Sequence, residues 1–466
     1  MNRALPAYVA VLLLCVLCKA QVPSQAAIVR VGIEPEKVLS SISEDFIGLG
    51  YEKSAVAQQG LLSANNTHLV QLYRTLSSHG LVRIGGNVSD HTKFVPDGVP
   101  LVRSEKETSV INRKSIEELA GFLRATGWKA MWGLNLGTGS KEEAAQEALA
   151  VQQMLGDRLQ SFQIGNEVDL LPRFKTYEGY YSAYRDYKAA IRKAVATSVF
   201  SGPDVAGNLQ WAIDFARTES RNMKLLTHHY YRTGAMRPDA TIDTLLGPDF
   251  RWENTLQKLK QASLDSGVCF RINEVNSFYG GGKFGVSDTF ASALWCLDYM
   301  FRLALYGCNG VNMETDINQL GWISHYSPIF RDKRNQLIAR AEYYGMLAFA
   351  VAGKGDLLKV TSTGNALSLS AYATRNAQGV FWGVLVNKDL SREATVEIVL
   401  PKSCVTADAY RLEAASAQSR DHVTLGGAEV STEGTWSPGP PEKLMVKAGV
   451  ALMRLPATSA ALVQLR

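Results

Sequence analysis

Two glutamates that end apolar segments are the residues of this chain with the clearest capacity for chemistry. Glu167 closes the run Gly165-Asn166-Glu167, and Glu274 follows Asn273 at the end of another apolar run. Cleavage of a glycosidic bond needs one carboxyl that protonates the leaving oxygen and a second that attacks or screens the anomeric carbon. We therefore assign Glu167 as the expected general acid/base and Glu274 as the expected nucleophile, provided that the fold brings them together.

Each of these residues also has a simpler interpretation. A glutamate is most often a solvated loop residue or the partner of a nearby cation, but the position at the end of an apolar strand favours the chemical role. Asn166 directly precedes the expected acid, and its amide could donate to a sugar 2-hydroxyl. It could equally cap the backbone, and the sequence leaves these two roles open.

Short apolar runs with strand character recur through the first 350 residues and alternate with helical segments, among them 141–155, 287–306 and 343–351. Eight such units predict a (β/α)₈ barrel, with a doubly wound open sheet as the alternative. Active sites of these barrels lie at the C-terminal ends of the strands, where both glutamates fall. The expected strands are Phe46–Glu52, Leu81–Gly86, Lys129–Leu136, Ser161–Glu167, Ser198–Asp204, Leu225–Tyr231, Cys269–Val275 and Gly310–Thr315.

After Gly353 the pattern changes to short strand-like runs separated by turn residues, which is typical of an antiparallel β-sandwich. The segment 27–40 is also strand-like, and we expect it to join this second domain. The expected boundaries are 21–44 for the N-terminal strand, 45–350 for the barrel and 351–466 for the sandwich. The expected sandwich strands are Leu357–Ser362, Ala366–Thr374, Gly379–Asn387, Ala394–Leu400, Ala407–Leu412, Leu444–Leu455 and Ala460–Leu465.

Residues 1–20 have the pattern of a cleaved secretory signal peptide, with a basic start, a short apolar core and Ala20 before the cleavage point. We therefore expect secretion to the periplasm or the extracellular space, with an uncleaved anchor helix as the alternative. The formal charge of +5 is too small to indicate a nucleic-acid partner. The four cysteines outside the signal are too scattered for a disulfide framework, and we expect mostly buried thiols with at most one bridge.

Several motifs together resemble glycoside hydrolase family 79, the heparanase and β-glucuronidase family of clan A. The run Asn273–Gly282 resembles its nucleophile region, together with Ser287–Phe290 and Trp295. Gly165–Glu167 resembles the acid/base motif of clan A, His228–Tyr231 the sixth-strand motif and Arg83–Gly86 the second strand. The chain lacks a long polar linker between its second and third expected strands, so it is most similar to the single-chain microbial-type members.

This resemblance implies further roles. Gly280 and Gly281 match the backbone amides that hold the uronate carboxylate in the family, and successive N–H groups of glycines form a natural anion nest. A flexible turn is the alternative for this segment. Tyr326 matches the family's carboxylate-binding tyrosine, although the local alignment is looser. The remaining expected contacts are Asn87 and Asp45 with sugar hydroxyls, Glu44 and Glu52 being competitors for the role of Asp45, and Tyr230 as a donor to Glu274.

The resemblance thus implies a retaining β-glucuronidase that needs no cofactor, because two carboxylates suffice for this reaction. The expected partner is a glucuronic-acid-containing saccharide or glycoconjugate; we expect a monomer that binds neither nucleic acid nor, after signal removal, a membrane. One alternative is a clan A enzyme for a neutral sugar, such as a xylosidase or arabinofuranosidase, but that substrate does not require the glycine loop. The other is a non-catalytic sugar-binding protein, which usually lacks one of the two carboxylates.

Overall fold

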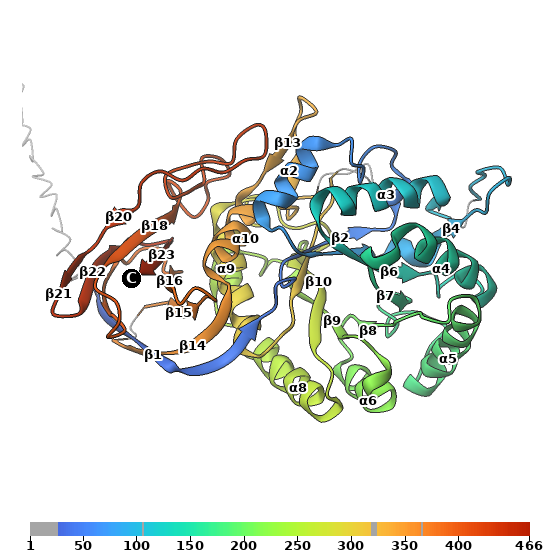
Figure 1. Ribbon diagram of the computed structural model, residues 1–466, viewed down its shortest axis with the longest axis horizontal. Helices are drawn as coiled ribbons and strands as arrows, with labels where there is room; N and C mark the ends of the chain where they lie inside the picture. Colours follow the sequence, from blue (N-terminus) through green and yellow to red (C-terminus); the bar gives the residue numbers. More distant parts are fainter. Residues whose placement is uncertain (1–26, 105–106, 318–323, 365–366) are drawn as a thin grey trace, which may run out of the picture.

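The computed structural model describes residues 27–104, 107–317, 324–364 and 367–466, and its larger part is a barrel (Figure 1). A parallel bridge between Phe162 and Phe200 connects the two ends of its eight-stranded sheet. The predicted (β/α)₈ barrel is therefore confirmed. Its strands, in chain order, are β2 (Gly48–Glu52), β3 (Leu81–Gly85), β6 (Lys129–Leu134), β7 (Leu159–Ile164), β8 (Gly202–Val205), β9 (Leu226–Gly234), β10 (Phe270–Tyr279) and β11 (Val311–Glu314).

Helices surround the barrel on the outside, and their ends follow local capping chemistry (Figure 1). Ser140 and Glu143 form a reciprocal capping box at the start of α4, and Gly127 ends α3 in a left-handed conformation. The helices are α1 (Ser54–Ala57), α2 (Thr67–Leu76), α3 (Arg113–Thr126), α4 (Lys141–Leu155), α5 (Tyr177–Ala194), α6 (Leu209–Glu219), α7 (Ile242–Leu246), α8 (Phe250–Ser266), α9 (Phe290–Leu305) and α10 (Ala341–Ala352).

The second domain is one curled sheet of eleven strands that includes the N-terminal strand, as predicted. β1 (Ala27–Ile42) pairs antiparallel with β14 (Gly355–Thr363) and parallel with β17 (Ala394–Val399), which is the parallel pair in an otherwise antiparallel sheet. The remaining strands are β15 (Leu369–Arg375), β16 (Phe381–Asn387), β18 (Ala407–Glu413), β19 (Thr424–Leu425), β20 (Glu442–Lys443), β21 (Met445–Lys447), β22 (Val450–Leu455) and β23 (Ser459–Leu465).

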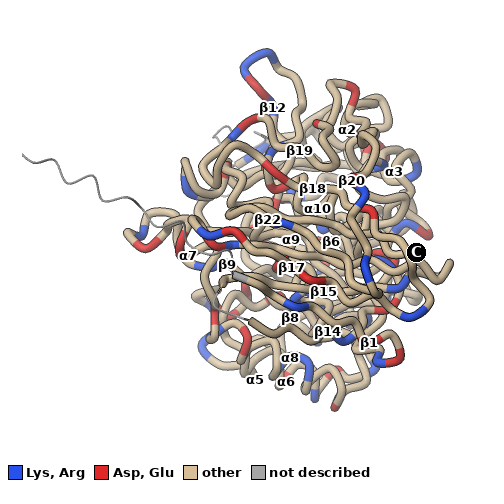
Figure 2. Tube along the Cα trace, turned by 90° about the vertical axis from the view of Figure 1, so that its left-hand side faces the viewer, with Lys and Arg blue, Asp and Glu red and all other residues tan. Residues whose placement is uncertain are grey.

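One expected strand of this domain was wrong. The run 444–455 is a hairpin of β21 and β22, because Ala448 and Gly449 between them adopt left-handed backbone angles of 51° and 75°. Figure 2 shows basic and acidic positions interspersed over this sheet, which agrees with the small net charge of the chain.

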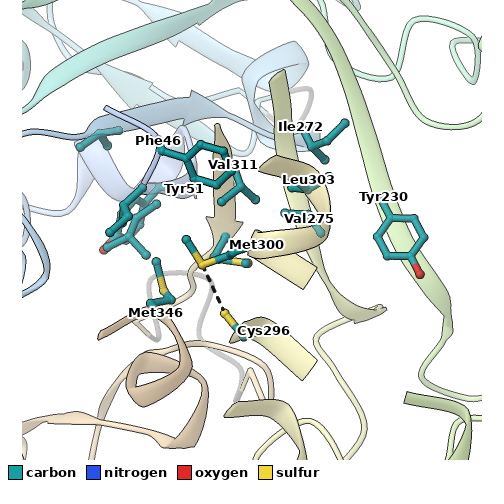
Figure 3. Packing of buried hydrophobic residues seen from close by; sticks show 14 of the residues in the cluster. Phe46, Tyr51, Tyr230, Ile272, Val275, Cys296, Met300, Leu303, Val311 and Met346 are labelled. Carbon is teal, nitrogen blue, oxygen red and sulfur yellow. Dashed lines mark hydrogen bonds between the residues drawn. The ribbon is translucent and has the colours of Figure 1, made fainter. Parts of the chain in front are cut away.

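The two domains share a continuous hydrophobic junction built on α9 and α10. Phe301 of α9 lies against Phe349 of α10 and against Tyr372 of β15, with ring centroids 4.8 and 5.0 Å apart. Figure 3 shows how Met300 and Leu303 of α9 pack toward the barrel strands. The sandwich side adds an ion pair of 2.6 Å between Lys388 and Asp298.

The start of α9 shows a second link between the domains. Its N-cap residue, Thr289, makes no side-chain capping bond. Instead, the backbone N–H groups of Phe290 and Ala291 donate to the carbonyl oxygens of Ser419 and Ala417 in the second domain, at 2.7 and 3.0 Å. Orphan donors at a helix start need such partners, so the second domain completes this helix.

Three further predictions concern the chain as a whole. The predicted signal peptide, residues 1–20, lies outside the described residues. Within the described ranges, no helix has both the length and the apolar character needed to cross a bilayer. All four described cysteines are free thiols, so the single bridge that the sequence allowed does not form, and Cys269 is exposed rather than buried.

Candidate active site

The structure brings the two predicted catalytic glutamates together at the barrel mouth. One oxygen of Glu167, one oxygen of Glu274 and a ring nitrogen of His229 all lie within 4.8 Å of one another. Glu274 lies within β10, and Glu167 follows the end of β7 after a turn that requires Gly165. A Cβ at Gly165 would lie 2.8 Å from Val168, and its φ of 86° is in the left-handed region.

Glu274 is buried and is held by two hydrogen-bond donors and a nearby imidazole. Arg83 Nη1 donates to its Oε2 at 2.6 Å, and the Tyr231 hydroxyl donates to its Oε1 at 3.1 Å. The third group, His229 Nδ1, lies 3.7 Å from Oε2. Burial alone would raise the pKa of Glu274, but His229, Arg83 and the Tyr231 hydroxyl together lower it below its usual value. The carboxylate is therefore ionised, as a nucleophile must be.

Arg83 is the centre of this network, although the sequence analysis placed it in a motif without giving it a role. The side chain is fully buried in β3. Besides Glu274, it donates to Asp204 at 3.0 Å and to the Asn166 side-chain oxygen at 2.5 Å. A cation inside an apolar strand must find anionic partners, and this signal could have identified Arg83 from the sequence.

His229 faces a carboxylate with each ring nitrogen. Nδ1 lies 3.2 Å from Glu167 Oε1, and Nε2 lies 3.7 Å from Asp204 Oδ2. Burial would lower the pKa of His229, but the Glu274, Asp204 and Glu167 carboxylates raise it to about 10. A doubly protonated imidazole has no lone pair for a metal ion, so the cluster fits an ion-paired site better than a metal site.

Asn166 is fixed by its neighbours in the site. Its side-chain NH₂ donates to Asn87 Oδ1 at 3.0 Å, and its backbone N–H donates to Asp90 at 3.1 Å. The same Asp90 carboxylate accepts from Leu136 and Gly137, which ties the loop after β6 to the loop after β7. The structure therefore brings the predicted residues Asn166 and Asn87 together, with Asn87 exposed at the mouth.

The predicted glycine loop and Tyr326 lie side by side next to the nucleophile. Gly280, Gly281 and Gly282 have φ angles of 81°, 82° and 81°, which L side chains rarely adopt. A Cβ on Gly282 would lie 2.7 Å from the Tyr326 backbone nitrogen. The Tyr326 ring stacks on Tyr231 with centroids 6.2 Å apart, and Tyr231 in turn contacts Glu274.

Two predicted contacts are wrong. The Tyr230 hydroxyl donates to Asp249 at 2.9 Å rather than to the nucleophile, and its ring stacks on Trp252 with centroids 4.1 Å apart. Side chains alternate along a strand, so Tyr230, which stacks on Trp252 of α8, and Tyr231, which contacts Glu274, face opposite sides of β9. Tyr231 therefore makes the bond that was assigned to Tyr230.

Asp45 lies at the opposite end of the barrel from the site. It precedes β2 and lines a cavity with His79, Gly80 and Lys129, which stand at the N-terminal ends of their strands. Asp45 therefore cannot contact a sugar bound at the mouth. Glu52, the competing residue at the C-terminal end of the same strand, accepts from Val88 N–H at 2.7 Å and interacts electrostatically with Glu274.

Two further carboxyls stand beside the nucleophile. Burial and the Glu274 charge raise the pKa of Glu52 to about 8. Burial, Glu274 and Glu52 raise the pKa of Glu314 well above its usual value. Both shifts favour the protonated form, in contrast to that of Glu274. Glu314 falls within the expected eighth strand, Gly310–Thr315, but no role was predicted for it.

Comparison with known proteins shows which enzymes the chain resembles. No family model matches the chain. A β-glucuronidase of Aspergillus niger is 25% identical over 360 residues, which cover 68% of this chain and 64% of that enzyme. A β-glucuronidase of Neurospora crassa is 23% identical over 400 residues, covering 72% and 68%. The chain is a distant homologue of the β-glucuronidases. It spans just under two thirds of the length of the Aspergillus enzyme.

Solved structures extend the similarity over nearly the whole chain. A 4-O-α-L-rhamnosyl-β-D-glucuronidase from Fusarium oxysporum superposes with a TM-score of 0.75 at 17% identity, covering 93% of this chain and 99% of that one. A family 51 α-L-arabinofuranosidase from Bifidobacterium longum gives a TM-score of 0.70 at 14% identity, covering 94% and 99%. The chain therefore shares the fold of these glycosidases, and the predicted resemblance to β-glucuronidases is confirmed.

Proposed function

We propose that this protein is a retaining glycoside hydrolase that cleaves β-glucuronides. The observation that carries the proposal is the spacing of the two carboxyls, with oxygens of Glu167 and Glu274 within 4.8 Å. Retaining enzymes hold these groups about 5–5.5 Å apart, whereas inverting enzymes need about 6.5–9.5 Å to admit a water molecule. The spacing leaves no room for a water between nucleophile and sugar, which supports direct attack.

The proposed reaction proceeds in two steps. Glu274 attacks the anomeric carbon while Glu167 gives its proton to the leaving oxygen, so that a glycosyl ester forms and the aglycone departs as an alcohol. Glu167, now a carboxylate, removes a proton from water, which attacks the same carbon and frees Glu274. Arg83 and Tyr231 keep Glu274 ionised before the attack, through bonds of 2.6 and 3.1 Å.

The glycine loop supports a uronate as the sugar. Consecutive glycines with left-handed φ angles can turn backbone N–H groups toward an anion, and Gly282, whose own N–H donates to Phe278, lies against Tyr326. The names of the fungal relatives point to the same substrate class. The sequence of residues 1–20 supports secretion, where such glycoconjugates would be met.

A panel of chromogenic glycosides tests this proposal. We expect a β-glucuronide to be hydrolysed with a kcat/KM at least about 10²-fold above those of a β-glucoside, a β-xyloside and an α-L-arabinofuranoside, because an unfilled anion site leaves its donors unpaired. Proton NMR of the first product formed should show the β-anomer. Comparable kcat/KM values for glucuronide and glucoside would reject the uronate site, and a first product with the α-anomer would reject the retaining mechanism.

A further inference from the structure

The inner wall of the barrel carries a carboxyl that the two-step reaction does not use. Glu314 ends β11, which lies between β2 and β10, and its register partner on β2 is Gly50. A Cβ on Gly50 would lie 2.5 Å from Glu314 Oε2. The carboxyl therefore lies across the β2 backbone, toward the barrel interior, and this arrangement requires a glycine at position 50.

Glu314 belongs to the same part of the site as Tyr326. The Asn276 side-chain NH₂ donates to the backbone oxygen of Glu314 at 3.1 Å and lies 3.4 Å from the backbone oxygen of Tyr326. Burial, and after it the proximity of Glu314, raises the pKa of the Tyr326 hydroxyl. Glu314 is thus next to the tyrosine that, under the proposed function, meets the substrate carboxylate.

Glu314 differs from Glu52 and Glu274 in its hydrogen bonds, although Glu342, which accepts from Asn276, likewise keeps one buried oxygen without a partner. Its side chain is 4% exposed, and Oε2 is buried with no hydrogen-bond partner. Glu52, by comparison, accepts a backbone N–H, and Glu274 accepts from Arg83 and Tyr231. A buried polar atom without a partner is rare and is a common mark of a group that a ligand completes.

The groups that act on Glu314 are mostly anionic or acidic. Burial, Glu274 and Glu52 raise its pKa, whereas Arg83, which donates to Glu274 and Asp204, acts in the opposite direction. The protonated carboxyl then has an O–H donor available. The titratable and charged groups that face it are Tyr51, Glu52, Arg83, Tyr231, Glu274, Asp316 and Tyr326.

We propose that Glu314 is a specificity-determining residue that donates a hydrogen bond, as a neutral carboxylic acid, to the carboxylate of the bound uronate. This inference rests on the proposed function. It adds a charge-assisted donor to those of the glycine loop and Tyr326, and it makes uronate binding depend on a proton. When Glu314 loses that proton, the donor is lost and a second negative charge faces the substrate.

The direct test measures competitive inhibition by glucuronate and by glucose across pH, in the wild type and in Glu314→Gln. In the wild type, we expect the Ki for glucuronate to rise at least about 10-fold on the alkaline side, while the Ki for glucose stays within about 2-fold. Glu314→Gln keeps an N–H donor but cannot ionise, so its Ki for glucuronate should not rise with pH. The exposed Glu433→Gln is the matched control and should behave as the wild type.

A second measurement keeps the proposal testable if Glu314→Gln fails to fold. Calorimetric titration with glucuronate, in buffers of different ionisation enthalpy, should show proton uptake that grows as the pH rises and that persists in Glu52→Gln. Loss of this uptake in Glu52→Gln, or an unchanged pH dependence in Glu314→Gln, would overturn the proposal. A wild type that prefers neutral glycosides would instead reject the proposed function itself, and the chromogenic panel distinguishes that outcome.

Discussion

The two halves of the active site differ in how far their polar groups are already paired. In the catalytic half, Arg83, Asp204 and His229 surround Glu274, and each charge faces an opposite charge. In the half that we propose to bind the uronate, Gly280 and Gly281 have left-handed backbone angles in a loop where the Gly282 N–H donates to Phe278, and Glu314 keeps an oxygen without a partner. The first half is organised before substrate arrives, while the second is completed by it.

This difference indicates a division of labour. A preorganised ionic network stabilises charge that develops in the transition state, whichever sugar is bound. A set of unpaired hydrogen-bond donors, by contrast, strengthens the binding only of a ligand that accepts those bonds. A ligand that leaves the donors unpaired binds more weakly. Substitutions in the catalytic half should therefore lower activity on all glycosides alike, whereas substitutions in the uronate half should change the preference among them.

The largest effect is expected at the nucleophile. Glu274→Ala should lower kcat by about 10⁴- to 10⁶-fold on both glucuronides and neutral glycosides, because the covalent step is lost. In Glu274→Gly, added azide should restore turnover and give the α-glycosyl azide, with inversion. In Glu167→Ala, azide should instead give the β-azide, with retention. Mass spectrometry of a trapped glycosyl–enzyme should locate the adduct on Glu274, and an adduct elsewhere would contradict the assignment.

Arg83 provides the next test of the catalytic half. Arg83→Met leaves the Glu274 carboxylate with less positive charge, so its pKa should rise and the acidic limb of kcat/KM should move to higher pH. We expect a loss of about 10²- to 10³-fold in kcat/KM on every glycoside, because the transition state loses a preorganised positive charge. Arg271 is the matched control, since it is equally buried but donates to Asn312 and backbone oxygens at the other end of the barrel. Arg271→Met should lower the stability of the protein without moving the pH dependence of kcat/KM. If the pH dependence also moved in Arg271→Met, its shift in Arg83→Met would reflect destabilisation and not the pKa of Glu274.

Two glycines of the loop, Gly280 and Gly282, allow a matched comparison within the proposed uronate site. Gly280 and Gly282 have the same φ of 81°, but a Cβ on Gly280 meets open space while one on Gly282 meets Tyr326. Gly282→Ala should therefore raise the KM for a glucuronide by about 10- to 100-fold and leave kcat/KM for a glucoside nearly unchanged. Gly280→Ala carries only the backbone strain, of about 1 kcal/mol, and should have a smaller effect. Equal effects of the two substitutions on the glucuronide would show that the backbone angle, and not the position of Tyr326, matters.

The smallest effect is expected at neighbouring tyrosines of β9. Tyr231→Phe removes one donor to Glu274 and should lower kcat/KM about 10-fold, since a hydrogen bond to a charged group contributes about 1.5–3 kcal/mol. Tyr230→Phe removes a bond to Asp249 outside the site, so steady-state kinetics should stay within about 2-fold of the wild type. If Tyr230→Phe were the more damaging of the two, the assignment of Tyr231 as the donor would be wrong.

Much of this fold could be predicted, because strand and helix periodicity record burial directly. The helix expected at 141–155 matches α4 residue for residue, since Ser140 and Glu143 define its start and Gly156 its end. The catalytic pair followed from the rule that strand ends of a barrel converge. These features depend on local sequence, which carries the hydrophobic period and the capping residues.

The errors concern which side of a strand a residue faces. In His228-His229-Tyr230-Tyr231, each face of the strand carries one histidine and one tyrosine. The sequence alone therefore cannot tell which tyrosine points into the barrel. The irregular pairing between β9 and β10, where His228 lies opposite Ile272 but His229 lies opposite Glu274, decides the orientation. No role could be predicted for Glu314 from the sequence, because the residues that contact it, Gly50 and Asn276, are distant along the chain.

The start of α9 links the choice of sugar to the second domain. Seven residues separate the glycine loop from this helix, which begins with two N–H groups that are satisfied by Ser419 and Ala417. A mutation that loosens the segment around these residues would free the helix end and, with it, the loop that we propose to bind the substrate. We therefore expect that selection can tune substrate preference from a distance, through the second domain. An evolutionary screen for altered glycoside choice should accordingly recover changes near 417–419 as well as in the barrel mouth.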